Sequence, residues 1–277
     1  MTGGESRTIV ITGASDGIGA AAAQQLHDAG DRVVVVGRDP AKTRAVAERI
    51  GAPWHLADFA ELSQVRELAA SLGERYPRID VLANNAGGIF GDRALTADGF
   101  EKTFQVNHLA PFLLTNLLRE RLVESAAAVI QTSSVAARRF ARFDIDDLQG
   151  ERRYSASAAY GNAKLANVLF TKELQRRWGV DGVNAVAFHP GAVATSFASA
   201  SPGSWRFVYT NPLSRRLLTS AETGGSRLTW LALGTPGVDW QPGQYYERNR
   251  IGPTNKAADD PLLARELWER SAALVGL

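Results

Sequence analysis

Residues 7–19 read RTIVITGASDGIG, and this stretch decides the fold. Its first half, Arg7–Thr12, is rich in β-branched residues and predicts a short buried strand that ends at Gly13. The residues from Gly17 to Ala29 predict a helix, with Gly30 in the position that commonly ends one. A strand, a glycine-rich turn and a helix in this order are typical of the first unit of a parallel α/β sheet.

The same alternation of strand and helix continues along the chain. Arg32–Val36 predicts a strand buried on both faces, and Pro40–Ile50 predicts a helix with proline in its first turn. We therefore expect one domain over residues 1–277, with a Rossmann-type, doubly wound parallel sheet and helices on both faces. The later elements of this α/β pattern are expected at Trp54–Leu56, Glu61–Tyr76, Ile79–Ala83, Ala127–Thr132, Ala159–Trp178 and Val183–Phe188.

Two stretches have no regular pattern, at residues 135–158 and at about 196–220. Segments of this length inside a domain are usually functional loops. We expect the first to be a surface insertion and the second to be a substrate lid. Apolar residues of the second, such as Trp205 and Phe207, either line a substrate pocket or dock the loop onto the body.

The composition excludes several classes of protein. The 277-residue chain has 31 basic and 29 acidic side chains, and its arginine pairs are scattered, so we expect no nucleic-acid surface. There is no cysteine, and the four histidines lack a metal-ligand spacing, so neither disulfides nor a metal site is expected. No run approaches the roughly 18 apolar residues of a membrane span. We expect a soluble, cytoplasmic protein, and the abundance of alanine and arginine favours a bacterial source.

The glycines at 13, 17 and 19 stand where a nucleotide-binding turn needs them. Gly13 permits the tight turn, Gly17 lets the backbone approach a pyrophosphate, and Gly19 allows close packing of helix on strand. Main-chain N–H groups at the start of the helix, between Ser15 and Ile18, would face the anion. The spacing is G-x-x-x-G-x-G, which differs from the G-x-G-x-x-G of two-domain dehydrogenases.

Four motifs together resemble the short-chain dehydrogenase/reductase family, and they follow that family's order over nearly the whole chain. They are the glycine turn, Asn84-Asn85-Ala86-Gly87, Tyr160-Gly161-Asn162-Ala163-Lys164 and Pro190-Gly191. Three further runs, Phe104–Leu109, Phe112–Leu118 and Lys164–Leu174, are similar to the retinol-dehydrogenase-like branch, as is Asp-Leu-Gln-Gly at 147–150. That branch acts on lipophilic carbonyls and alcohols. Its membrane-bound members carry an N-terminal apolar anchor, whereas here the first strand is expected from about Arg7.

The resemblance implies an active site of Ser134, Tyr160, Lys164 and Asn107. Tyr160 and Lys164 are four residues apart on one expected helix, so their side chains share a face. A nearby ammonium would favour the phenolate of Tyr160, because an ordinary tyrosine has a pKa near 10. By the family's pattern Ser134 hydrogen-bonds the substrate oxygen, with Ser133 as the alternative. Asn107 would hold a water beside the lysine, or else satisfy the backbone of its helix.

The resemblance also implies a nicotinamide cofactor. Gly37 leaves room after the second strand and Arg38 offers a planar fork for a 2′-phosphate, which favours NADP(H) over NAD(H). Against this, Asp16 would repel that phosphate if it pointed inward. By the family's pattern, the other contacts are Asp58 with the adenine, Asn84, Ala86 and Gly87 with the adenosine ribose, and Pro190, Gly191, Val193 and Thr195 with the nicotinamide carboxamide, while His189 beside them is structural.

We expect an NADP(H)-dependent oxidoreductase that transfers hydride between nicotinamide and a small lipophilic carbonyl or alcohol. The alternatives are an NAD-linked dehydrogenase and a non-catalytic NADP-binding redox sensor or scaffold, and the complete tetrad argues against the second. Relatives often pair through the helices that carry Asn107 and Tyr160. The sequence therefore allows a homodimer but leaves the number of subunits open, because residues 135–158 could block that face.

Overall fold

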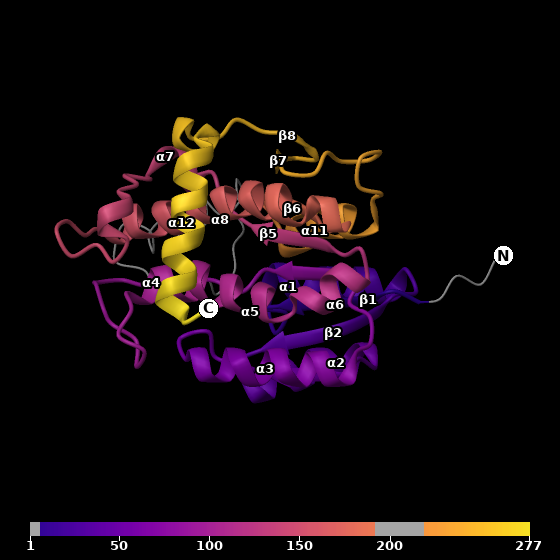
Figure 1. Ribbon diagram of the computed structural model, residues 1–277. Helices are drawn as coiled ribbons and strands as arrows, with labels where there is room; N and C mark the ends of the chain where they lie inside the picture. Colours follow the sequence, from indigo (N-terminus) through magenta and orange to yellow (C-terminus); the bar gives the residue numbers. More distant parts are fainter. Residues whose placement is uncertain (1–5, 192–218) are drawn as a thin grey trace.

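The computed structural model describes residues 6–191 and 219–277. Within them lies an eight-stranded sheet of order β3-β2-β1-β4-β5-β6-β7-β8, parallel throughout except for the last pair (Figure 1). The first six positions follow the doubly wound dinucleotide-binding order, so the expected fold class is confirmed. The strands are β1 (Thr8–Thr12), β2 (Arg32–Gly37), β3 (Trp54–Leu56), β4 (Val81–Asn84), β5 (Ala128–Thr132), β6 (Asn184–His189), β7 (Tyr245–Glu247) and β8 (Arg250–Ile251).

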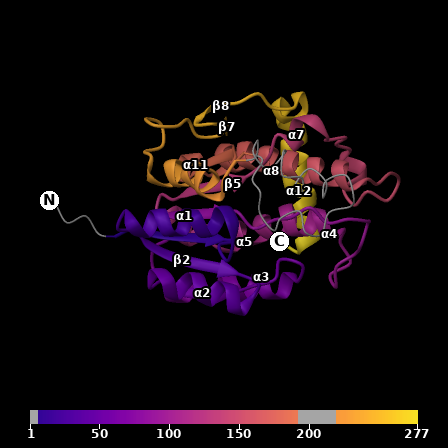
Figure 2. The same cartoon turned by 180° about the vertical axis from the view of Figure 1, so that it is seen from behind.

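Helices cover both faces of this sheet, as the two opposite views show (Figures 1 and 2). Alternate residues of β1 serve the two sides: Ile9 and Ile11 pack with α1, α2 and α11, while Val10 packs with α3 and α5. This is why the central strands are apolar on both faces. The helices are α1 (Gly17–Asp28), α2 (Pro40–Ile50), α3 (Leu62–Arg75), α4 (Lys102–Phe104), α5 (Ala110–Leu117), α6 (Arg119–Glu124), α7 (Ala136–Arg139), α8 (Ala156–Trp178), α11 (Ala221–Leu233) and α12 (Pro261–Val275).

The C-terminal helix α12 lies across α8 and α5 (Figure 1). Asp260 caps its first turn, Pro261 follows, and Gly276 ends it with a φ of 70°. Trp268 packs edge-on to Phe112 of α5 and against Phe170 of α8, with ring centroids 5.0 and 5.5 Å apart. Helices α5 and α8 are therefore both covered by the C-terminal helix.

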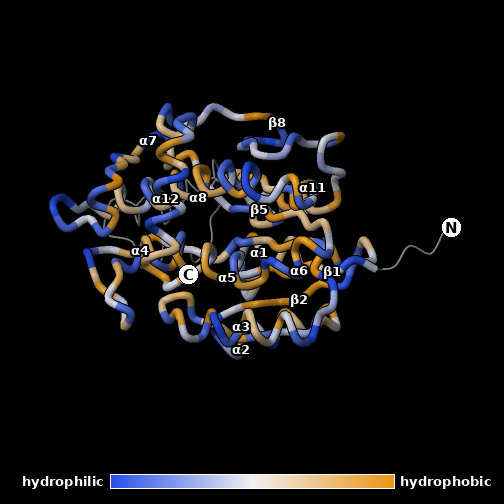
Figure 3. The backbone as a smooth tube through the Cα atoms, in the orientation of Figure 1, coloured by the Kyte–Doolittle hydropathy of each residue, from blue (hydrophilic) through white to orange (hydrophobic). Residues whose placement is uncertain are grey.

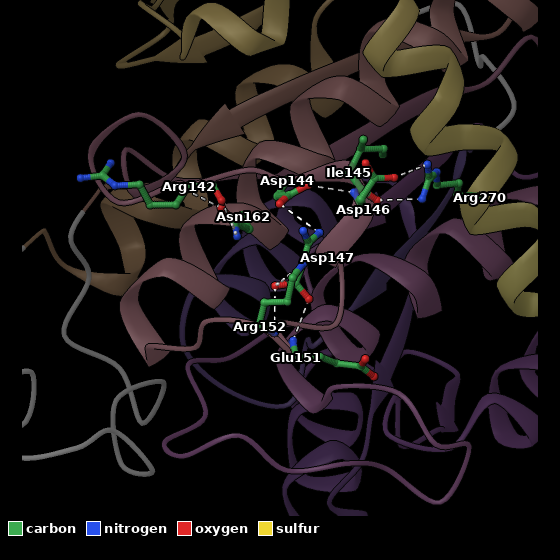
Figure 4. A network of polar contacts seen from close by, with 9 residues as sticks. All are labelled: Arg142, Asp144, Ile145, Asp146, Asp147, Glu151, Arg152, Asn162 and Arg270. Atoms are coloured by element: carbon green, nitrogen blue, oxygen red, sulfur yellow. Dashed lines mark hydrogen bonds and ion pairs between the residues drawn. The ribbon is translucent and has the colours of Figure 1, made fainter.

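The insertion at residues 135–158 is ordered by polar contacts rather than by a core of its own (Figure 4). Arg152 pairs with Asp144 at 3.2 Å, and Arg270 of α12 pairs with Asp146 at 2.7 Å. The main-chain N–H of Arg142 donates to Asn162 Oδ1 of α8. Figure 3 shows the apolar character of strand β2. The expected lid at 196–220 lies almost entirely outside the described residues.

Candidate active site

A cleft of about 410 Å³ opens at the carboxyl ends of β1, β2, β4, β5 and β6, the edge where ligands bind in doubly wound sheets. It runs from the glycine turn to the end of β6. Among the described residues no helix has the length and apolar character to cross a membrane, and no cluster of potential metal ligands occurs. The expected site residues that line the cleft are Gly13, Ser15, Gly17, Ile18, Arg38, Asp58, Ala86, Gly87, Ser134, Tyr160, Lys164, Pro190 and Gly191.

The remaining expected residues lie elsewhere. Gly19 and Asn107 sit behind the wall of the cleft, and Val193 and Thr195 fall outside the described residues. Asn84 also does not line the cleft: it is 3% exposed and donates to Thr115 Oγ1 at 2.9 Å. Its neighbour Asn85 faces the cleft instead and donates to the main-chain oxygens of β1 and the glycine turn. Side chains alternate along a strand, so adjacent asparagines at its end point to different sides.

The glycine turn is built as expected. Gly13 has a φ of 65°, and a Cβ on it would stand 2.8 Å from Ala86 Cα, so turn and β4 loop touch through backbone. A Cβ on Gly19 would collide with the carbonyl oxygen of Gly13. Both positions therefore require glycine for packing, which leaves the edge of the turn open to a ligand.

At the adenosine end, two basic residues stand near the turn. Arg38 is exposed and lines the cleft. Asp16 uses one carboxylate oxygen to cap α1 at Gly17 N–H, 2.7 Å away, and the other lies 3.5 Å from Lys42 Nζ. The ion pair with Lys42 reduces the repulsion that Asp16 would exert on a phosphate. Sequence reasoning missed Lys42, because its pairing with Asp16 is visible only once α1 and α2 are packed.

Gly37 has a different role from the expected one. A Cβ there would meet Thr43 Oγ1 and stand 2.8 Å from Ser15 Cβ. The space beside Gly37 is thus filled by two hydroxyl-bearing side chains rather than left vacant for a phosphate. The glycine lets the turn and α2 approach β2.

Tyr160 and Lys164 share one face of α8, with Lys164 Nζ 5.5 Å from the centre of the Tyr160 ring. A Cβ on the intervening Gly161 would stand 2.6 Å from Ala141 N and 2.8 Å from the carbonyl carbon of Phe140. The glycine between the two residues thus lets the segment after α7 press directly on α8. This close contact holds the catalytic pair against the cleft.

Lys164 is buried to 2% exposure, and its Nζ donates to the main-chain oxygen of Thr132 at 3.0 Å. Burial lowers the pKa of Lys164 from 10.5 to about 7, because the ammonium has lost most of its water. Asn167 Nδ2 donates to the same oxygen at 3.3 Å. The lysine is therefore held in place by this hydrogen bond, and its other N–H groups are available to donate to a ligand in the cleft.

The two candidate serines have different surroundings. Ser133 is 1% exposed, and its hydroxyl donates to the main-chain oxygen of Lys164 at 2.7 Å. Ser134 is half-buried in the cleft, and its Oγ accepts only a 3.2 Å bond from Ala136 N–H. Its hydroxyl proton is free to point to a ligand, so the structure favours Ser134 over Ser133.

Asn107 lies in a π-helical turn at Gln105–Leu109 and is fully buried. Its Nδ2 donates to the main-chain oxygens of Thr103 and Gly88 at 2.8 and 2.9 Å, and its Oδ1 accepts from Gly88 N–H at 3.1 Å. The side-chain amide of Asn107 therefore hydrogen-bonds main-chain groups, which is the second of the two roles expected from the sequence. Its Oδ1 can still accept one more hydrogen bond.

Gly87 lies between Asn107 and Lys164. The point where its Cβ would sit is 2.5 Å from Asn107 Oδ1 and 3.1 Å from Lys164 Nζ. That point is close to hydrogen-bonding distance from both atoms, so a water there would bridge them. The missing side chain at Gly87 thus leaves a small polar space beside the lysine.

The helix of Asn107 is braced by a residue that sequence reasoning missed. Glu101 is 2% exposed and caps α4, accepting from Thr103 and Phe104 N–H groups at 2.9 and 2.7 Å. Tyr154 of the insertion donates to the same carboxylate at 3.2 Å, and burial raises the pKa of Tyr154 to about 12, so its hydroxyl keeps its proton. Gln149 Oε1 accepts from Glu101 N–H at 2.7 Å. The insertion is therefore bound to the catalytic helix through Glu101.

Comparison with known proteins gives a consistent result. A family model described as short chain dehydrogenase matches residues 7–203. A Streptomyces sp. (strain C5) protein, provisionally named daunorubicin C-13 ketoreductase DnrU, is 48% identical over 98% of this chain and 93% of its own length. Human retinol dehydrogenase 13 is 38% identical over 98% of this chain and 85% of its own length.

The fold is shared with solved structures as well. A crystal structure of an uncharacterized protein from Mycobacterium paratuberculosis has 32% sequence identity and a TM-score of 0.77. The superposition covers 98% of this chain and 93% of that one. The likeness therefore extends over nearly the full length of both chains.

Proposed function

The chain belongs to the short chain dehydrogenase family and is an oxidoreductase acting on CH–OH or C=O groups, and we propose that it transfers hydride between NADP(H) and a small, largely apolar carbonyl or alcohol. The observation that carries this proposal is that Ser134, Tyr160 and Lys164 line one cleft together with the glycine turn, with Lys164 Nζ 5.5 Å from the centre of the Tyr160 ring. NADP(H), when bound, supplies or accepts the hydride. The protein's own groups handle the proton and the carbonyl oxygen.

In the proposed reduction, Tyr160 donates its phenolic proton to the substrate oxygen, and Ser134 donates a hydrogen bond to the same oxygen. The Lys164 ammonium stabilises the resulting phenolate by charge. Asn107 Oδ1 and Lys164 Nζ hold a water over Gly87, which returns a proton to the site. Each step uses groups that already face one another, so little reorganisation is needed.

The choice of NADP(H) rests on Arg38 and Lys42, two cations near the end of β2. The carboxylate that follows β2, Asp39, caps α2 by accepting from Lys42 N–H at 3.0 Å and is not among the residues that line the cleft. Asp16, the residue that argued against a phosphate, is engaged by α1 and by Lys42. NAD(H) remains the alternative cofactor.

An apolar substrate is supported by the apolar side chains that line the cleft. Ile89 and Phe140 pack with Tyr160, and Phe90 also lines the cleft. Two relatives are named for daunorubicin and for retinol, both of which carry a large apolar ring or chain. Because α12 covers α5 and α8, we propose that a homodimer formed on that face would pair through α12, which cross-linking from α12 would detect.

Tyr160→Phe is the direct test. We expect turnover with an accepted ketone or aldehyde to fall by about 10²- to 10⁴-fold, because the proton donor is lost. The affinity for NADPH, measured by fluorescence titration, should stay within about threefold. Full turnover by Tyr160→Phe would refute the mechanism, and NADPH binding without turnover of any carbonyl would favour the redox-sensor alternative.

A further inference from the structure

At the end of β6 the wall of the cleft carries one arginine. Arg139 from α7 lines it together with His189 and Gly191 at the end of β6. The Arg139 side chain is exposed, and its guanidinium has no ion-pair or hydrogen-bond partner in the described part of the chain. An arginine that borders a catalytic cleft without a counterion is available to a ligand.

Two more guanidiniums approach the same point from other elements. Arg227 of α11 reaches over Gly191, where its Nη1 is 2.8 Å from the position of an added Cβ. Arg248 follows Glu247, the residue directly beside His189 in the sheet register. Glu247 is the carboxylate that faces this group, and it also accepts a 3.2 Å hydrogen bond from the Tyr245 hydroxyl.

His189 responds to all three arginines. Burial lowers its pKa to about 4, and the charges of Arg227, Arg139 and Arg248 lower it further in that order of importance. The imidazole is therefore neutral at pH 7 and adds no charge, while its Nδ1 is buried and has no hydrogen-bond partner. Three cations that act on one group repel one another unless an anion lies among them.

The acidic residues of the cleft are at its other end. Among the described lining residues the carboxylates are Asp16 and Asp58, both beside the adenosine position. The end that receives the substrate thus offers arginine, histidine and apolar side chains. Among the described residues Glu247 offsets one of the three arginines, and a neutral apolar molecule would leave the rest of this positive charge without a partner there.

We propose that the substrate end of the cleft selects carbonyl compounds that carry a negatively charged group such as a carboxylate, with Arg139 as its first contact and Arg227 behind it. The inference rests on the proposed function and narrows its substrate class. The apolar part of such a molecule lies against Phe90 and Phe140, and its anionic end reaches the arginines.

The test uses two aldehydes that differ only in charge, 4-formylbenzoate and its methyl ester. We expect the enzyme to show a kcat/KM at least about tenfold higher for the carboxylate, an advantage that falls as salt is raised. Arg139→Gln should abolish this advantage through a higher KM and leave the ester within about twofold. Arg138→Gln is the matched control, because Arg138 is the adjacent exposed arginine of α7 and does not line the cleft.

Binding of the same two aldehydes to NADPH-loaded Tyr160→Phe protein, measured by calorimetry, gives the preference without turnover. A failure of hydride transfer therefore leaves this result intact. Equal binding of the two compounds, preference for the ester, or equal effects of Arg139→Gln and Arg138→Gln would overturn the proposal. A rise in the Kd for NADPH in Arg139→Gln or Arg227→Gln, with unchanged substrate preference, would assign the arginines to the cofactor and also overturn it.

Discussion

The space over Gly87 is the feature whose role can be tested most sharply. A methyl group at this position would stand 2.5 Å from Asn107 Oδ1 and 3.1 Å from Lys164 Nζ. Neither atom can withdraw easily, because Asn107 is held by three backbone hydrogen bonds and Lys164 is buried against Thr132. Gly87→Ala must therefore displace the asparagine amide and exclude any water between the two groups.

The magnitude follows from these contacts. Loss of the bond between Asn107 Oδ1 and Gly88 N–H leaves buried polar atoms unpaired, which costs about 1–3 kcal/mol of unfolding free energy. If the space holds the water that returns protons to Tyr160, kcat should fall by about 10²-fold or more. Gly88→Ala is the control, because its methyl would meet only the end of the Phe90 side chain at 3.1 Å. Neither glycine has a positive φ, so backbone strain does not separate the two variants.

The assay follows NADPH oxidation over about pH 6 to 9, with chemical denaturation measured on the same preparations. Gly87→Ala should lose most of its kcat and alter the pH profile, while Gly88→Ala keeps both within about twofold. Retention of half the kcat with an unchanged pH profile in Gly87→Ala would refute the reasoning. A stability loss without a kcat loss would assign Gly87 to packing alone.

Three further predictions concern charged residues. The native state should bind fewer protons than the unfolded chain between about pH 7 and pH 10.5, because burial lowers the pKa of Lys164 to about 7. The free energy of unfolding should therefore rise with pH across this window. The inactive variant Lys164→Met should be more stable than the parent protein below pH 7, by a few kcal/mol. Denaturation titrations at several pH values should show that this gain disappears near pH 10.5. Arg38→Ala should raise the Kd for NADPH by about 10- to 100-fold and leave that for NADH unchanged, with a smaller effect in Lys42→Ala; equal loss for both cofactors would contradict the assignment. Glu101→Gln should lower the free energy of unfolding by about 2 kcal/mol and reduce kcat severalfold. A kcat equal to that of the parent enzyme would show that Glu101 stabilises the fold without contributing to turnover.

The parallel strands were predictable because burial on both faces leaves unbroken apolar runs such as β2. Tyr160 and Lys164 were predictable because they match the motif of the family that the sequence resembles, and helix periodicity places them on one face. The sequence pattern placed Asn84 in the cleft, whereas the structure places Asn85 there. Side chains alternate between the two faces of a strand, so an error of one residue in the end of β4 exchanges the residue that faces the cleft for its neighbour. Glu101 and Lys42 act on partners from other elements, so no local pattern indicates them. The helix α12 had a readable signal in Asp260, Pro261 and Gly276, but its place across α8 depends on packing.

That place gives α12 a part in positioning both catalytic helices. His108, next to Asn107 in the π-helical turn, has its Nε2 2.9 Å from Ser271 Oγ of α12, and burial lowers the pKa of His108 to about 3, so it stays neutral there. Trp268 of the same helix packs on Phe170 of α8. Burial of the lysine ammonium costs free energy, so a rearrangement that returned Lys164 to water would be favourable. A helix that is exposed on most sides would be free to rearrange in this way. Contacts from the insertion at Gly161 and Asn162 and from α12 at Phe170 restrain α8, which keeps Lys164 beside Tyr160 despite that cost.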